Sequence, residues 1–68
     1  MKKFELKQDY IQLNNLLKIM DFVGSGGEAK LLITDGAVCV NKAVETQIRK
    51  KLRKGDVIEF DQHKIEIT

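Results

Sequence analysis

This chain of 68 residues has no proline, no tryptophan and only one cysteine, Cys39. A single cysteine cannot form an internal disulfide, and secreted domains of this size usually need several, so a reducing compartment is favoured. No apolar run approaches the roughly 18–20 residues that cross a bilayer. The first residues, 1–6, lack the long apolar core of a signal peptide. We therefore expect a cytoplasmic protein that forms one domain over residues 1–68.

Aromatic side chains are also few, and the familiar catalytic and metal-binding patterns are missing. Aromatic residues make up 6% of the chain, which argues against a surface that binds single strands by stacking several bases. One histidine and one cysteine do not make a metal site, and there is no Walker-type or G-x-G-x-x-G loop. Cys39 has no obvious partner base. We predict no catalytic residue, no cofactor and no metal.

Positive charge, in contrast, is concentrated in one segment. Residues 49–54 hold five of the twelve cations and none of the ten acids, which leaves seven cations and ten acids elsewhere. Leu52 interrupts this run and is expected to anchor it to the core. A compact protein with one positive patch indicates a polyanion as partner. From charge alone, a solvated loop that only maintains solubility is an equally good interpretation.

Hydrophobic spacing predicts two short helices. Apolar residues within 13–20 recur at i, i+3, i+4 and i+7, as on one helical face, with Asp9 as the expected N-cap. Ser25 and Glu28 have the spacing of a capping box for a second helix, and Gly36 is placed to end it in a left-handed conformation. Two helices this short must pack as a hairpin, because neither buries its apolar face alone.

Alternating apolar and polar residues predict strands on both sides of the helices. Residues 3–6 form a short strand, and residues 38–40 form another that leads into a turn at Asn41-Lys42. Two further strands, 57–60 and 64–67, are joined across a turn in which His63 is expected to be solvated. The order of strand, two helices and three or four strands indicates an α+β fold.

The start of the second helix is a candidate anion site. Gly26 and Gly27 lack side chains, so a phosphate can approach free backbone N–H groups at the positive end of the helix dipole. Lys30 lies one turn along and can reach the same anion. Taken alone, a Ser-Gly-Gly-Glu sequence at a helix start more often has a structural role than a binding role. The Glu28 carboxylate also disfavours anion binding if it already occupies the site. Lys18 projects away from the leucine face and either borders this surface or is simply exposed.

The candidate binding residues come from both helices, one turn and the cationic run. They are Lys18, Ser25, Gly26, Gly27, Lys30, Asn41, Arg49, Lys50, Lys51 and Arg53. Asn41 is also expected to stabilise its own turn through side-chain to backbone hydrogen bonds. With so few aromatic residues, recognition of a folded RNA by shape and backbone contacts suits this set best.

Several motifs together resemble the S4 RNA-binding domain, in its short stand-alone bacterial form of the YbcJ/YaaA kind. The resemblance covers nearly the whole chain and rests on segments 16–18, 25–30, 36–41, 49–53 and 55–58. It implies an S4-like αL motif, in which a two-helix hairpin packs on a small, mostly antiparallel sheet. It also implies structured RNA as ligand, often ribosomal RNA or tRNA, with ribosomal particles as a further candidate partner. Larger members commonly carry an arginine where this chain has Gly26, which shifts the expected phosphate contacts toward Lys30 and residues 49–53.

Two other functions stay open. A small ubiquitin-like carrier or protein-interaction domain has a similar length and a late Gly-Asp turn, but sulfur carriers end in Gly-Gly whereas this chain ends in Ile67-Thr68. DNA binding would use the second helix as reader, and that helix offers only Lys30 and few groups suited to base edges. We expect non-catalytic binding of structured RNA through a basic surface formed by the helical hairpin and the 49–54 loop.

Overall fold

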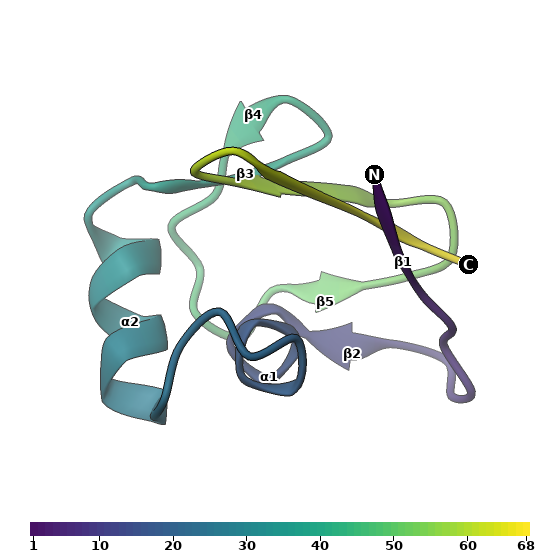
Figure 1. The fold of residues 1–68 in the computed structure, drawn as a ribbon, viewed down its shortest axis with the longest axis horizontal. Coiled ribbons are helices and arrows are strands. Elements are labelled where there is room, and N and C mark those ends of the chain that lie inside the picture. The colour runs from purple at the N-terminus through teal and green to yellow at the C-terminus, as the bar shows by residue number, and fades with distance from the viewer.

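The computed structural model describes residues 1–68, and its elements form two layers (Figure 1). The upper layer is a sheet with strand order β1-β7-β6-β3-β4. Its strands are β1 (Lys2–Phe4), β3 (Val38–Val40), β4 (Ala43–Val44), β6 (Val57–Phe60) and β7 (His63–Ile67). The lower layer holds α1 (Leu13–Ile19), α2 (Gly26–Thr34) and a small sheet of β2 (Ile11–Gln12) with β5 (Lys51–Leu52). Only the β1–β7 pair is parallel, which confirms a mostly antiparallel α+β fold.

The hydrophobic core lies between the two layers. Leu13, Leu16 and Leu17 of α1 are fully buried, as are Ala29 and Ile33 of α2. This confirms the predicted apolar faces and the hairpin that they form. The sheet adds residues at alternate positions, which share its inner face, namely Val38, Val40, Ile58, Ile65 and Ile67. Neither helix has the length and apolar character needed to span a membrane.

The first helix begins later than the sequence pattern predicted. Its N-cap residue is Gln12, which makes no side-chain cap bond, so the prediction of Asp9 as N-cap is wrong. The amide of Leu13 instead donates to the carbonyl oxygen of Lys50 at 2.9 Å. A distant backbone carbonyl thus satisfies one of the amides that a helix start leaves without a partner.

The second helix and the turn after β3 lie where they were predicted. The side chain of Ser25 caps α2, and Gly36 follows its end with a φ of +80°. Asn41 and Lys42 both have positive φ, at 53° and 70°. Left-handed conformations at both central residues are typical of a two-residue turn of type I′ between antiparallel strands.

His63 corrects the prediction for the last hairpin. The strand β7 begins at His63, one residue earlier than expected, so this histidine is not a turn residue. Its ring stacks on Phe22 with a centroid separation of 4.5 Å and an interplanar angle of 24°. The side chain is exposed, as expected for a solvated histidine, and its ring also packs against the loop between α1 and α2.

Candidate nucleic-acid interface

The start of α2 is capped in a way that leaves part of it open. The Ser25 hydroxyl accepts a hydrogen bond from the Glu28 amide at 3.3 Å. The Glu28 carboxylate turns back and accepts from the Gly24 amide, also at 3.3 Å. The predicted capping by Ser25 is confirmed, with the return bond reaching Gly24. The carboxylate therefore does not bond the amides of Gly26 and Gly27.

Those two glycine amides have no hydrogen-bond partner within the protein. Gly26 and Gly27 are exposed and form the first turn of α2, where amides point out of the helix. Without side chains, nothing on these residues covers their N–H groups. The arrangement provides two adjacent donors at the positive end of a helix dipole, which suits a phosphate oxygen.

Lys18 on α1 lies beside this helix start. A Cβ built on Gly26 would have the Lys18 ammonium nitrogen as its nearest neighbour, at 4.0 Å. Lys18 is exposed and no carboxylate lies within ion-pairing distance of it, since the one ion pair in the molecule joins Lys7 and Glu5. Packing of the two helices thus places an unpaired positive charge next to two free amides, a combination that attracts an anion more strongly than either group alone.

Lys30 extends the same edge of the hairpin. It is exposed on α2, one helical turn beyond Gly26 and Gly27, and makes no ion pair. Because residues three and four apart share a helical face, Lys30 lies on the side of α2 that these glycines begin.

The cationic run is not the free loop that was expected. Lys51–Leu52 forms the strand β5, which pairs with β2, and Leu52 is fully buried, as predicted. The Lys50 carbonyl is bonded to the first turn of α1, so this end of the run is docked on the helical hairpin. The Lys51 ammonium lies over the ring of Tyr10, 4.9 Å from its centroid.

The other end of the run belongs to a hydrogen-bonded turn. The amide of Arg53 donates to the Asp56 carboxylate at 2.8 Å, and the Asn41 side chain donates to the other oxygen of the same carboxylate at 3.0 Å. The Asn41 side-chain oxygen in turn accepts from the Val57 amide at 2.9 Å. Asn41 was expected to stabilise its own turn, and instead it joins that turn to the one at Gly55. Both polar atoms of the Asn41 side chain are used in these bonds, which hold the two turns together.

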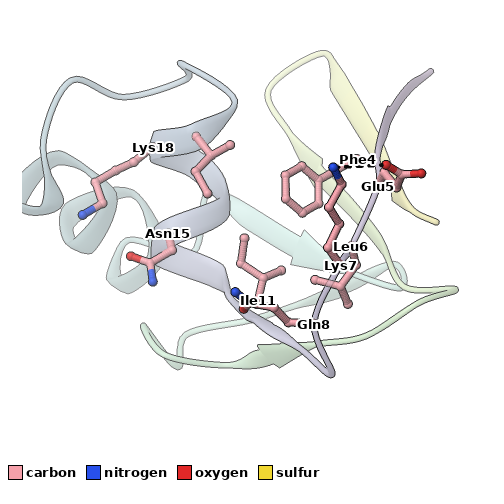
Figure 2. A pocket seen from close by; sticks show the side chains of 9 residues that line it. Phe4, Glu5, Leu6, Lys7, Gln8, Ile11, Asn15 and Lys18 are labelled. Atoms are coloured by element: carbon pink, nitrogen blue, oxygen red, sulfur yellow. Dashed lines mark ion pairs between the residues drawn. The ribbon is translucent and has the colours of Figure 1, made fainter.

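Sequence reasoning missed a set of polar side chains around α1. Tyr10 lies under Lys51, and Gln8 and Asn15 line a groove beside the helix (Figure 2). The hydrophobic spacing of the helix pointed only to its buried face. Asn15 and Lys18 are three residues apart, and this spacing was the available signal that they share an exposed face.

Comparison with known proteins identifies the family. The family described as "S4 domain" matches residues 4–68. This chain belongs to the S4 domain family. The hairpin of α1 and α2 packed on a mostly antiparallel sheet is the S4-like arrangement that the sequence motifs predicted, and it replaces the ubiquitin-like alternative for the fold.

Two curated relatives align with most of this chain. "Putative RNA-binding protein YbcJ" of Escherichia coli (strain K12) is 37% identical over 62 residues, which are 91% of this chain and 89% of the relative. "Probable ribosome maturation protein RlbA" of Bacillus subtilis (strain 168) is 36% identical over 53 residues, 78% of this chain and 75% of the relative.

A solved structure has the same fold. The solution structure of YbcJ from E. coli matches with a TM-score of 0.76 at 36% identity, covering all of this chain and 87% of the other. That structure is described as revealing an αL motif involved in RNA binding. The αL hairpin is thus shared between the two chains.

Proposed function

We propose that this S4 domain binds structured RNA without catalysing a reaction, through a surface centred on the start of α2. The observation that carries the proposal is the position of the Lys18 ammonium beside the free amides of Gly26 and Gly27. A phosphate oxygen held there accepts from both amides while Lys18 neutralises its charge. Ser25 keeps the turn in the conformation that exposes these groups.

Further phosphate contacts come from the rest of the basic surface. Lys30 extends it along α2, and Arg49, Lys50 and Lys51 extend it beyond the opposite end of α1, where the run is docked. The seven-residue helix α1 is roughly 10 Å long at about 1.5 Å per residue. One RNA can thus contact both groups of cations. Arg53 adds charge at the far end of the run.

Ribosomal RNA or tRNA is the class of ligand that we favour. Both are folded RNAs with a continuous phosphate backbone, which suits cations held on a rigid scaffold better than a flexible single strand does. The names of the two curated relatives, one an RNA-binding protein and the other a ribosome maturation protein, support this choice and ribosomal particles as partner. With such ligands, we expect the protein to act in the cytoplasm.

The proposal predicts that Lys18→Ala weakens binding to ribosomal RNA fragments. We expect a loss of about tenfold, because a charge-assisted hydrogen bond is lost, and a salt slope that is smaller by about one. The parent slope should lie at roughly −3 to −5 if four to six phosphates are neutralised. Fluorescence anisotropy titrations at several salt concentrations measure both quantities.

The matched control is Lys64→Ala. Lys64 lies between His63 and Ile65 on β7, and because Ile65 is buried, Lys64 points to the sheet face away from the helices. Its removal should change affinity by less than about twofold, as expected for a distant charge in salt. An Arg49→Ala/Lys51→Ala double variant tests the second group of cations. Unchanged affinity in both the Lys18 variant and the double variant would refute this interface.

A further inference from the structure

A groove open to solvent lies between α1 and the segment that joins β1 to β2 (Figure 2). It has two lobes of about 630 and 420 Å³. The lobes adjoin, since Gln8, Ile11 and Asn15 line both of them. Each lobe falls within the roughly 300–1,000 Å³ typical of sites for small organic groups.

The walls of the groove combine apolar surface with unused hydrogen-bonding groups. Ile19 is 59% exposed and lines the larger lobe beside Phe4 and Ile11. The side-chain amides of Gln8 and Asn15 line both lobes and make no hydrogen bond within the protein. An amide offers a donor and an acceptor side by side, which is the pattern that a nucleobase edge requires.

A lysine ammonium lies near each end of the groove, although the one charged residue that lines the smaller lobe itself is Asp9. At one end, Lys18 lines the larger lobe and its ammonium reaches the start of α2. At the other end, Tyr10 lines the smaller lobe with the Lys51 ammonium over its ring. The depression thus lies between the two groups of cations that the proposed function assigns to phosphates.

We infer that the groove takes one unpaired base of the RNA, an inference that rests on the proposed function. A nucleobase has a flat apolar face, which fits against Ile11 and Ile19, and a polar edge, which fits the amides of Gln8 and Asn15. The phosphates on either side of that nucleotide would then meet Lys18 and Lys51. Bases within an A-form duplex do not offer their faces, so the ligand is a folded RNA with a bulge or loop nucleotide.

Two blunt-ended RNA duplexes, each annealed from two strands, test this inference. One is fully paired, and the other has the same base pairs with a single added bulged nucleotide. The parent protein should bind the bulged duplex about tenfold more tightly, the scale expected for stacking and edge contacts to one base. A Gln8→Ala/Asn15→Ala variant should lose most of that preference while its affinity for the paired duplex changes less than about twofold. Gln62→Ala is the matched control, since Gln62 is an exposed amide in the β6–β7 turn.

The outcomes separate the groove from the phosphate site. Lys18→Ala should weaken binding to both duplexes by a similar factor, because Lys18 contacts the phosphate backbone and not the base. Equal affinity of the parent for both duplexes, or a preference that survives in the double variant with its fold intact by circular dichroism, would overturn the base site alone. Failure of the parent to bind either duplex or ribosomal RNA would overturn the RNA-binding proposal and the groove with it.

Discussion

Two short segments of this protein use the same kinds of residue for different purposes. The start of α2 and the turn at 53–57 each combine glycine, an acidic residue and lysine or arginine. In the 53–57 turn most of the backbone donors are occupied, with the Gly55 amide bonded to the Ile67 carbonyl at 2.8 Å and the Arg53 amide bonded to the Asp56 carboxylate. At the start of α2, the amides of Gly26 and Gly27 have no partner.

This difference shows that charge density alone does not locate the binding site. The 49–54 segment has the highest concentration of cations in the chain, yet its backbone is largely used to hold strands and α1 together. The α2 start has fewer cations but offers free donors beside Lys18. Free donors next to an unpaired cation mark a site for an anion, whereas satisfied donors mark a fixed turn.

The largest expected effect is on the anchor of the cationic run. Leu52 is fully buried within β5, so Leu52→Ala should lower the free energy of unfolding by about 2–5 kcal/mol. Urea denaturation followed by circular dichroism measures this change. Lys54→Ala, at an exposed position of the same cationic run, is the control and should shift stability by less than about 0.5 kcal/mol. A small effect of the Leu52 substitution would show that packing of Leu52 in the hydrophobic core is not what holds residues 49–54 in place.

A smaller loss of stability is expected at the satisfied turn. Gly55 has a φ of +96°, and a methyl group added there would have no other atom within 4 Å. Gly55→Ala therefore meets only backbone strain, of about 1–2 kcal/mol. Thermal unfolding measures the loss. RNA affinity of the folded variant should match the parent, because this turn is not the centre of the proposed interface. A stable variant with weakened RNA binding would reverse the assignment of the two segments.

Sequence patterns predicted those parts of the fold and site that depend on nearby residues. Ser25 as cap and Gly36 as terminator lie next to the helix that they bound, so both are visible in the sequence. The two-residue strands Ile11–Gln12 and Lys51–Leu52 are too short to show alternation, and they pair across most of the chain. The prediction of Asp9 as N-cap failed for this reason, because a distant carbonyl satisfies the helix start.

The candidate site divides in the same way. Gly26, Gly27 and Lys30 belong to one helix and were found from their spacing. The approach of Lys18 to Gly26 depends on how α1 packs against α2, which spacing along one helix does not reveal. Asn41 was placed correctly in a turn, but its bonds to Asp56 and Val57 join two turns that only the sheet brings together.

The smallest expected change in stability comes from the most informative substitution, Gly26→Ala. The added methyl group would have only the flexible end of Lys18 as a neighbour, at 4.0 Å, and alanine favours helix over glycine by up to about 1 kcal/mol. Stability should thus stay level or rise slightly. RNA affinity should fall by roughly three- to tenfold, since the methyl group stands between Lys18 and the free amides and hinders the approach of a phosphate to them.

Gly26→Ala is therefore expected to lose RNA affinity and keep its stability, whereas Gly55→Ala is expected to lose stability and keep its RNA affinity. Thermal unfolding and anisotropy titrations on the same preparation measure both effects, with Ala37→Gly as a control for a methyl change at an exposed position outside both segments. If Gly26→Ala binds ribosomal RNA as tightly as the parent, the amides at the start of α2 do not contact phosphate. The interface would then have to be built on lysine and arginine side chains alone, those of Lys18, Lys30 and residues 49–53.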